Sequence, residues 1–276
     1  MTLLRDVLAA ARARLPAHEA RMLLGHVLGR DAAWLIAHDD QVLDGDAIRT
    51  FASLTARRVS GEPLAYLIGE REFFGHRFAV GPGVLIPRPE TELLVEVTLA
   101  HLRANYSGGG TAHVLDLGTG SGCVAISIAL AAPHVKVTAV DVSAEALALA
   151  RVNADRLCAS VHLLSSNWFS ALHDERFDVI VGNPPYIAAV DPHLAQGDLR
   201  HEPAGALASG ADGLDALRDI VAAAPAHLAP GGALWLEHGY DQATAVRTLL
   251  VAAGFGDVAS RRDLAGIDRI SGGRRK

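Results

Sequence analysis

Two segments of the chain combine residue types that could hold a small ligand and act on it. The first is the glycine-rich stretch Gly118-Thr-Gly-Ser-Gly122, which follows a predicted strand at residues 113–117. Glycine adopts the positive backbone angles of a tight turn and has no Cβ to block a ligand, so this stretch is typical of a cofactor-binding turn between a strand and a helix. A dinucleotide site would need glycine or alanine at position 123, where this chain has cysteine. The turn therefore disfavours a nicotinamide cofactor, and an ordinary turn without a ligand is the alternative.

A carboxylate follows the next predicted strand, at residues 135–140. Asp141 stands 23 residues after Gly118, a spacing at which an acidic side chain accepts hydrogen bonds from ribose hydroxyls. The alternative is that it only caps the helix predicted to begin near Ser143. Asp116, just before the first glycine, favours a cationic ligand over a pyrophosphate. The combined pattern resembles that of S-adenosylmethionine-dependent methyltransferases, whose cofactor carries a sulfonium and an ammonium group.

The second segment is Asn183-Pro-Pro-Tyr186, which follows the predicted strand 177–181 and Gly182. Proline has a fixed φ and no N–H, so two prolines would hold the Asn183 side chain and the Pro184 carbonyl rigidly at the end of a strand. Two such acceptors could orient both N–H bonds of a planar amino group, while Tyr186 stacks on its plane. The alternative is a rigid turn without chemistry. The tetrapeptide resembles the motif of methyltransferases that act on the amino group of adenine, the amino group of guanine or a glutamine side chain.

Several further segments resemble the release factor glutamine methyltransferases, and the resemblance spans nearly the whole chain. These segments are Gly61-Glu-Pro-Leu-Ala-Tyr-Leu-Ile-Gly69, Phe73-Phe-Gly75, Val84-Leu-Ile-Pro-Arg-Pro-Glu-Thr-Glu92, Glu202-Pro203, Gly213-Leu214, Leu236-Glu-His-Gly239 and residues 263–269. The resemblance implies methyl transfer from S-adenosylmethionine to N5 of the glutamine in the Gly-Gly-Gln motif of peptide chain release factors. S-adenosylhomocysteine would be the other product, and no metal is implied.

The resemblance also implies roles for individual residues. The cofactor would bind to Gly118, Thr119, Gly120, Ser121, Gly122, Asp141, Trp168 and Asn183. The substrate would bind to Asn183, Pro184, Pro185 and Tyr186, of which Asn183, Pro184 and Tyr186 are the expected catalytic residues. Trp168 would pack its ring on the adenine. Asn167 stands where the family commonly has aspartate, and residues 87–91 are expected either to cover the active site or to begin the next helix.

The elements that must position these residues follow from the apolar pattern. After residue 113, short β-branched runs alternate with amphipathic stretches, which indicates a parallel sheet covered by helices. Before residue 69 the apolar spacing is helical, and the Phe-, Gly- and Pro-containing stretch near residues 72–85 indicates a hairpin-like connector. We therefore expect an α/β fold with a Rossmann-like methyltransferase domain at 87–276, seven-stranded by the resemblance. A hairpin connector would occupy 72–86 and a helical substrate-recognition domain 1–71.

Composition limits the classes of partner. The chain has 276 residues, half of them hydrophobic, and a net charge of −6. Its first 75 residues carry nine arginines and ten acidic side chains, a net charge of −1, so no large basic face is expected for phosphate binding. We therefore expect a protein substrate and neither a nucleic acid nor a membrane partner. An adenine-amino methyltransferase of DNA or RNA, and a non-catalytic protein that binds release factors, remain the alternatives.

Three smaller expectations concern the compartment, the cysteines and the tail. Only two cysteines occur, Cys123 and Cys158, at a spacing typical of neither a disulfide nor a zinc site, and we expect both to be small buried apolar residues in a reducing compartment. No run is apolar enough for a signal peptide or a membrane span, so a cytoplasmic location is expected. Residues 274–276 are expected to be a frayed, solvated tail.

Overall fold

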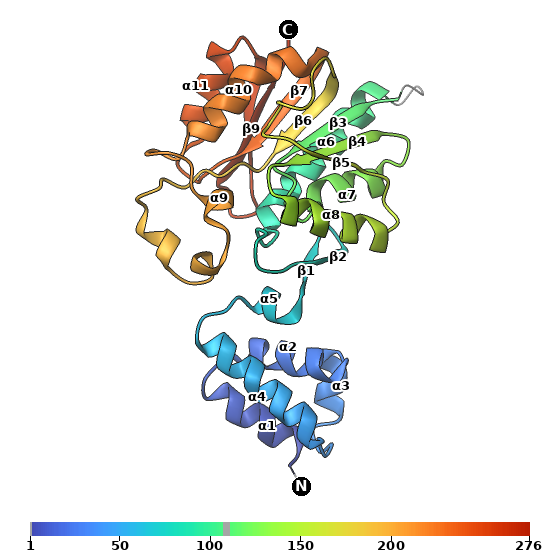
Figure 1. Cartoon of the computed structure of the whole chain (residues 1–276), viewed down its shortest axis with the longest axis vertical. Helices are drawn as coiled ribbons and strands as arrows, with labels where there is room; N and C mark the ends of the chain where they lie inside the picture. Colours follow the sequence, from blue (N-terminus) through green and yellow to red (C-terminus); the bar gives the residue numbers. More distant parts are fainter. Residues whose placement is uncertain (1, 107–110) are drawn as a thin grey trace. The chain divides into compact units, whose positions relative to one another are not determined.

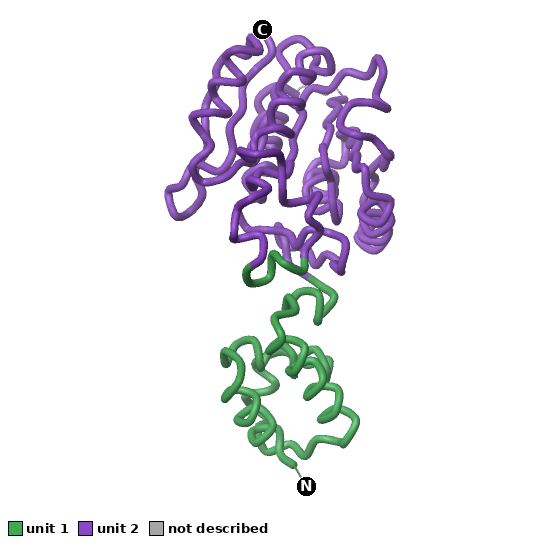
Figure 2. The backbone as a smooth tube through the Cα atoms, turned by 60° about the vertical axis from the view of Figure 1, so that its left-hand side comes forward, with its two compact units in different colours: residues 1–70, 196–201 green, residues 71–195, 202–276 purple. Residues whose placement is uncertain are grey.

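The computed structural model describes residues 2–106 and 111–276, which form two compact units. Figure 2 colours them: the first comprises residues 1–70 and 196–201, and the second comprises residues 71–195 and 202–276. The short segment 196–201 thus belongs to the first unit, although the residues on both sides of it belong to the second.

The first unit is helical. Its helices are α1 (Leu4–Arg12), α2 (Ala17–Leu28), α3 (Ala32–Ala37), α4 (Gly45–Val59) and α5 (Leu64–Ile68). The side chains of Asp31 and Asp44 accept hydrogen bonds from the first turns of α3 and α4, the usual N-terminal cap. Arg58 on α4 binds Glu19 at 2.8 Å and Asp198 of the 196–201 segment at 2.8 Å. This arginine therefore attaches the segment to the helices of its own unit.

The second unit contains a two-stranded sheet and a seven-stranded sheet (Figure 1). The strands are β1 (Glu70–Phe73), β2 (His76–Ala79), β3 (His113–Leu117), β4 (Lys136–Asp141), β5 (His162–Ser165), β6 (Phe177–Gly182), β7 (Leu228–Glu237), β8 (Gly256–Arg262) and β9 (Asp268–Arg274). The large sheet has the order β5-β4-β3-β6-β7-β9-β8, and its first five strands run parallel. Their carboxyl ends therefore meet at one edge of the sheet.

Helices cover both faces of the large sheet, because alternate strand residues project to opposite sides. On one face, Val114 and Val179 pack with apolar residues of α6 (Glu92–Tyr106), α7 (Cys123–Ala131) and α8 (Ala144–Arg156). On the other, Leu115 and Ile180 pack with α10 (Asp215–His227) and α11 (Ala243–Ala252). The remaining helical turns are η1 (Pro89–Thr91), η2 (Pro192–Ala195), η3 (Leu199–His201) and α9 (Ala204–Leu207). The predicted α/β class, with a seven-stranded sheet, a helical N-terminal part and a hairpin, is confirmed.

The hairpin β1–β2 turns at Phe74 and Gly75, which have φ of 49° and 76°. Two consecutive positive φ values are typical of the two-residue turn that matches strand twist. Asn153 on α8 fastens β2 to the glycine-rich turn: its amide accepts from the N–H of Ala79 at 2.7 Å and donates to the carbonyls of Ala79 and Ser121 at 3.0 and 2.9 Å. The Asn153 side chain is fully buried, so a single buried amide joins the hairpin to the glycine-rich turn.

The last strand, β9, for which the sequence pattern made no prediction, pairs antiparallel with both β7 and β8, because a short turn joins β8 to β9 and only a long crossover would allow a parallel strand. Two sequence expectations are wrong. Residues 274–276 are not a frayed tail: Arg274 ends β9, the N–H of Arg275 donates to the Gly232 carbonyl at 2.8 Å, and its guanidinium binds the Leu228 carbonyl. Cys123 is buried as expected, but Cys158 is exposed, since it follows the end of α8 in a left-handed turn with φ of 54°.

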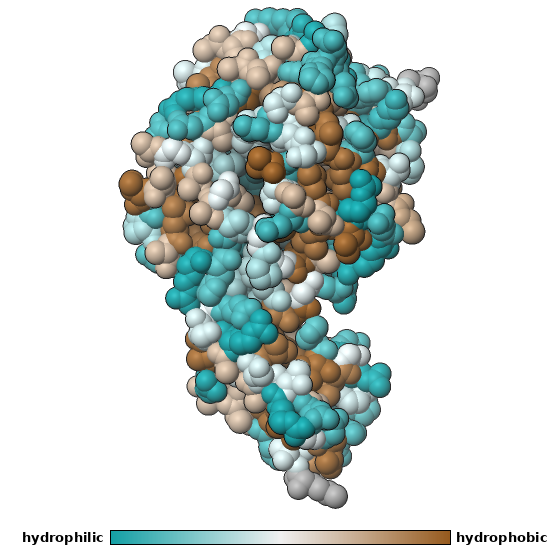
Figure 3. Space-filling view, viewed as in Figure 1, coloured by the Kyte–Doolittle hydropathy of each residue, from teal (hydrophilic) through white to brown (hydrophobic). Residues whose placement is uncertain are grey.

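On the face shown in Figure 3, hydrophilic and hydrophobic residues are interspersed over both units. Within the described residues, no helix combines the length and the hydropathy that crossing a bilayer requires.

The hydrogen bonds of Asn153 to Ala79 and Ser121 predict a contribution to the stability of the protein. In Asn153→Ala, the N–H and carbonyl of the partly buried Ala79 and the buried carbonyl of Ser121 lose their partner, so the free energy of unfolding should fall by about 3 kcal/mol. Urea denaturation followed by circular dichroism measures this change. Val152→Ala, an exposed position on the same helix, should lie within about 0.5 kcal/mol of the unmodified protein; equal stability of the two variants would contradict this role of Asn153.

Candidate active site

The glycine-rich turn and Asp141 form one hydrogen-bonded unit at the carboxyl edge of the sheet. Gly118, Gly120 and Gly122 have φ of 68°, 55° and 81°, a region that residues with a Cβ rarely adopt. The N–H of Gly120 donates to Asp141 Oδ2 at 2.9 Å, and the N–H of Ser143 donates to Oδ1 at 2.9 Å. The cap of α8 is Ser143, whose hydroxyl accepts from the N–H of Ala146. Asp141 is therefore not the helix cap, and each of its oxygens keeps acceptor capacity for a ligand hydroxyl.

Asp116 lies beneath this turn and is 2% exposed. It accepts a hydrogen bond from the Thr119 hydroxyl at 2.6 Å. Burial raises the pKa of Asp116 to about 7, since the charged form is poorly solvated there; the hydrogen bonds from Thr119 and the Ala125 backbone oppose this rise, and the nearby charge of Asp141 adds to it. A cation bound beside Asp116 would favour its ionised form.

Two cavities adjoin at the turn and share the residues Gly118 and Asn183. The first is also lined by Asp141, Val142, Ser166, Asn167, Trp168, Pro185, Gly205 and Ala206. The second is also lined by Leu85, Pro87, Arg88, Thr91, Asp116, Thr119, Gly120, Ser121, Cys123 and Val124. The predicted cofactor residues thus separate into a group around Asp141 and Trp168 and a group around Asp116.

The chemistry of these two linings fits S-adenosylmethionine. An aromatic ring and a carboxylate in the first suit an adenosine, with Trp168 for the base and Asp141 for the ribose hydroxyls. The buried carboxylate in the second suits the ammonium and sulfonium charges. Trp168 has φ of 49°, and its ring lies 3.5 Å from the position that a Cβ on Gly118 would take. Asn167, in the position of the family's aspartate, lines the same cavity.

Gly122 has a packing role. It lies outside the lining of both cavities, and a Cβ there would lie 2.8 Å from Ile126 and 3.1 Å from Ala150. The structure therefore separates this glycine, which allows α7 and α8 to approach, from Gly118 and Gly120, which face the cavities.

The Asn183-Pro-Pro-Tyr186 segment begins directly after β6, at the same sheet edge. Asn183 lines both cavities and Pro185 lines the first, whereas Pro184 is buried. The Tyr186 hydroxyl donates to Glu237 Oε1 at 3.1 Å, and the Gln242 amide donates to the Tyr186 carbonyl at 2.9 Å. A Cβ on residue 213 would lie 2.3 Å from that same carbonyl, so only glycine fits there. Contacts from residues 213, 237 and 242, which are distant in the sequence, thus restrict this segment in addition to the two prolines.

Three residues outside the predicted site residues, Thr91, Glu202 and Glu237, contact this segment or its neighbours. Thr91 ends η1 and lines the second cavity, and it binds both Asn183 and Glu237. Glu202 is buried; it accepts from the Ile86 N–H at 3.1 Å and binds the Arg88 guanidinium. Residues 87–91 lead into α6, and Pro87, Arg88 and Thr91 among them line the second cavity; that they cover the active site stays a prediction. Glu237 was detectable in principle, because it is an acidic residue at the carboxyl end of a strand beside β6.

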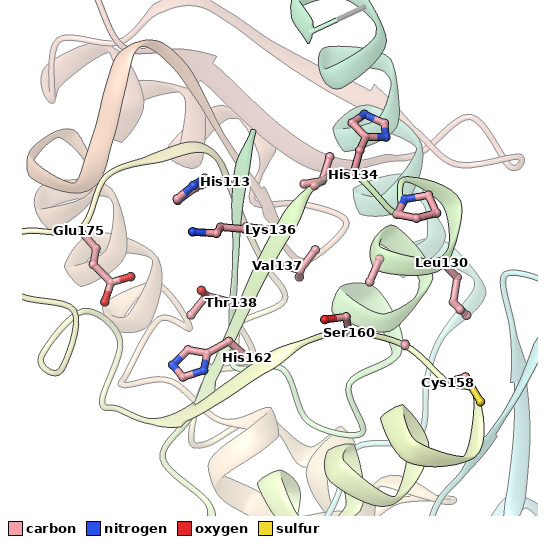
Figure 4. Close-up of a pocket in the computed structure, with 14 residues that line it drawn as sticks. His113, Leu130, His134, Lys136, Val137, Thr138, Cys158, Ser160, His162 and Glu175 are labelled. Atoms are coloured by element: carbon pink, nitrogen blue, oxygen red, sulfur yellow. The ribbon is translucent and has the colours of Figure 1, made fainter. Parts of the chain in front are cut away.

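Another cavity, of about 670 Å³, lies at the opposite, amino ends of the strands (Figure 4). Its polar side chains include Lys136, Thr138 and His162 on β4 and β5, with Glu175 facing them. The connection from β5 to β6, residues 166–176, contains no helix and is described throughout, which accounts for this opening on the sheet. None of the predicted site residues lines it.

Comparisons with known proteins found two family models and many relatives that match this chain. The family model described as Methyltransferase small domain matches residues 90–210, and the PrmC N-terminal domain matches residues 2–69. A release factor glutamine methyltransferase of Bordetella pertussis is 57% identical over 274 residues, 99% of both chains. One of Burkholderia pseudomallei is 55% identical over 267 residues, 94% of this chain and 92% of that protein. A methyltransferase of Pyrococcus furiosus superposes with a TM-score of 0.54 at 21% identity, covering 81% of this chain and 98% of that one, a likeness of fold alone.

The buried carboxyl of Asp116 predicts a pH-dependent affinity for a cationic ligand. Below its pKa of about 7, Asp116 is protonated and neutral; above it, the carboxylate attracts the cation, so the affinity for S-adenosylmethionine should increase as the pH rises through 7. Isothermal titration calorimetry at several pH values measures this slope. In Asp116→Asn the slope should be smaller, and an identical slope in both proteins would contradict the assignment.

The ring of Trp168 makes a second binding prediction. Trp168→Ala should weaken the binding of S-adenosylhomocysteine by about tenfold or more, since stacking of a base on an aromatic ring contributes about 1–3 kcal/mol. Trp34→Ala is the matched control, because Trp34 stacks on His38 within the helical unit. Calorimetric titration measures the affinity of both variants for S-adenosylhomocysteine. Equal affinities of Trp168→Ala and Trp34→Ala would contradict a role for Trp168 in cofactor binding.

Proposed function

This chain belongs to the release factor glutamine methyltransferase family, and from that premise we propose that it methylates N5 of the glutamine in the Gly-Gly-Gln motif of peptide chain release factors. Its identity to curated relatives extends over almost their whole length. The single observation that carries the proposal is that Asn183, at the end of β6, borders the cavity around Asp141 and the cavity around Asp116.

We propose that the cofactor is held by Asp141 and Trp168 at its adenosine end and by Asp116 at its cationic end. When bound, S-adenosylmethionine supplies a methyl group on positively charged sulfur, which a nitrogen can take by direct displacement to leave S-adenosylhomocysteine. Gly118 and Gly120 allow the close approach of the ligand, because neither presents a Cβ. Thr119 and Ser121 complete the same turn.

The chain's main contribution would be to orient the glutamine amide. An amide nitrogen is a poor nucleophile because its lone pair is delocalised, and acceptors on its two N–H bonds favour the geometry in which that lone pair attacks. Asn183 Oδ1 and the Pro184 carbonyl would be these acceptors, while Pro185 and Tyr186 bound the substrate. Holding the two reactants at attack distance contributes up to about 7–11 kcal/mol in favourable cases. The methylated nitrogen is acidic and can release its proton to water.

The helical domain, proposed at residues 1–71 with a connector at 72–86 and a methyltransferase domain at 87–276, would recognise the release factor. Its first 75 residues carry a net charge of −1, which suits a protein surface better than a phosphate backbone. A release factor as substrate would also place the enzyme in the cytoplasm. The adenine-amino alternative shares the Asn183 motif and therefore has to be tested directly.

The decisive experiment offers a purified release factor and an adenine-containing nucleic acid side by side with labelled S-adenosylmethionine. The expected result is one added methyl group on the Gly-Gly-Gln glutamine, located by mass spectrometry, with no label in the nucleic acid. Label in the nucleic acid would favour the adenine-amino activity. Release-factor binding without methyl transfer would favour a non-catalytic binder.

Asn183 should be indispensable for the transfer. Asn183→Ala removes one acceptor of the substrate N–H bonds, so kcat should fall by about 100-fold or more. The affinity for S-adenosylhomocysteine should weaken much less. Single-turnover assays and calorimetry measure the two quantities separately. Asn105→Ala, an exposed position on α6, is the matched control, and near-normal turnover by Asn183→Ala would exclude this mechanism.

A further inference from the structure

A chain of hydrogen bonds extends from the partly exposed Asn183 to the buried Glu237. Asn183 Nδ2 donates to Thr91 Oγ1 at 3.2 Å, and Thr91 Oγ1 donates to Glu237 Oε2 at 2.7 Å. The other oxygen of Glu237 accepts from the Tyr186 hydroxyl at 3.1 Å. Thr91 and Glu237 are 3% and 2% exposed, so little water competes for these bonds.

The topology explains why these residues meet. Glu237 is the last residue of β7 and Asn183 follows β6; the neighbouring strands pair in register, with Gly182 opposite Leu236. Thr91 reaches the same sheet edge from η1, at the start of α6. The three side chains therefore come from three separate parts of the chain.

We infer that Glu237, acting through Thr91, is a positioning residue that sets which end of the Asn183 amide faces the substrate. This inference rests on the proposed function. A carboxylate only accepts hydrogen bonds, so ionised Glu237 takes the hydroxyl hydrogens of both Thr91 and Tyr186. Thr91 Oγ1 then has only lone pairs to offer Asn183. Its partner has to be the Nδ2 donor, which leaves Oδ1 directed at the cavity.

This orientation matters because the two ends of an amide group are opposite in function. Oδ1 accepts a hydrogen bond from an N–H of the substrate glutamine. Nδ2 in the same place would only donate, so its N–H groups would face the N–H groups of the substrate without a hydrogen bond. When Glu237 is protonated, it can donate to the Thr91 oxygen. The Thr91 hydroxyl can then donate toward Asn183. The amide orientation with Oδ1 facing Thr91 and Nδ2 facing the cavity becomes the more stable one, because Oδ1 accepts this hydrogen bond. Ionisation of Glu237 therefore selects the productive form.

The charges around Glu237 set the pH at which this selection changes. Burial raises the pKa of Glu237 to about 7; the bonds from Thr91 and Tyr186 oppose the rise, as does the Arg269 guanidinium, while the charge of Glu90 adds to it. Cys123 also lies within electrostatic range, and burial raises the pKa of its thiol to about 12. Burial likewise raises the pKa of the Tyr186 hydroxyl, so Tyr186 stays a donor. Glu237 loses its proton as the pH rises through about 7, which predicts a kcat that falls below that pH.

Glu237→Gln tests the inference with an isosteric change. Glutamine accepts at one position and donates at the other, so it cannot take both hydroxyl hydrogens. At saturating S-adenosylmethionine, kcat for release-factor methylation should fall by about tenfold or more and lose its decline below pH 7, while KM stays within about threefold. Saturation separates this effect from Asp116, whose charge acts on cofactor affinity. An unchanged kcat and pH profile would overturn the inference.

Thr91 supplies a second, independent pair of variants. Thr91→Val removes the bridging hydroxyl and should lower kcat by about tenfold, while Thr91→Ser keeps the hydroxyl and should retain most of the activity. Thr98→Val is the matched control: Thr98 is buried on α6 and its hydroxyl donates to the Leu94 carbonyl, so kcat should be unchanged. Equal losses in Thr91→Val and Thr91→Ser would mean a purely structural role, and would overturn the inference even if Glu237→Gln fails to fold.

Two further readouts separate this inference from the proposed function. Thermal unfolding and S-adenosylhomocysteine titration establish that each variant is folded and binds the cofactor product. If the unmodified protein methylates no release factor, the proposed function fails. If it does so and the Glu237 and Thr91 variants match it in kcat and pH profile, only the positioning role fails.

Discussion

The site depends on one geometric constraint: parallel strands end at the same edge of a sheet. In β3, β4, β6 and β7 this rule brings Gly118, Asp141, Asn183 and Glu237 together, although they are far apart in sequence. The glycine-rich turn, the carboxylate proposed to bind the ribose and the asparagine proposed to bind the substrate amide would be unrelated motifs without it. The antiparallel β9 completes the sheet beyond β7 and leaves this edge unaltered.

Two buried carboxyl groups give the site its electrostatic character. Asp116 and Glu237 each have a pKa raised to about 7 by burial, so neither is permanently charged near neutral pH. Their surroundings differ. Asp116 borders a cavity and is available to a cationic ligand, whereas Glu237 has both oxygens bonded to protein hydroxyls. Burial therefore makes one carboxyl responsive to a ligand and the other responsive to a hydrogen-bond network.

The stiffness of the site has two sources. The prolines 184 and 185 restrict the backbone locally. Contacts from elsewhere in the unit complete the restraint: Gln242 holds the Tyr186 carbonyl, Glu202 holds residues 86 and 88, and Asn153 holds the turn at residue 121. Side-chain amides and carboxylates suit this task because each joins two or three backbone or side-chain groups at once.

The sequence by itself determined the fold class and the position of both motifs, because glycine and proline act on their own backbone and apolar periodicity reports which face of an element is buried. The family followed from the resemblance of several segments to the release factor glutamine methyltransferases. The sequence did not indicate the direction of β9 or the exposure of Cys158, since a hairpin return and a left-handed helix end leave little trace in an apolar pattern. The tertiary structure alone decided the partners of the motifs. Thr91 and Asn183 are 92 residues apart, Thr91 and Glu237 are 146 apart, and Asn153 and Ala79 are 74 apart. Such hydrogen bonds depend on distances between side chains, which are set only when the strands have paired and the helices have packed.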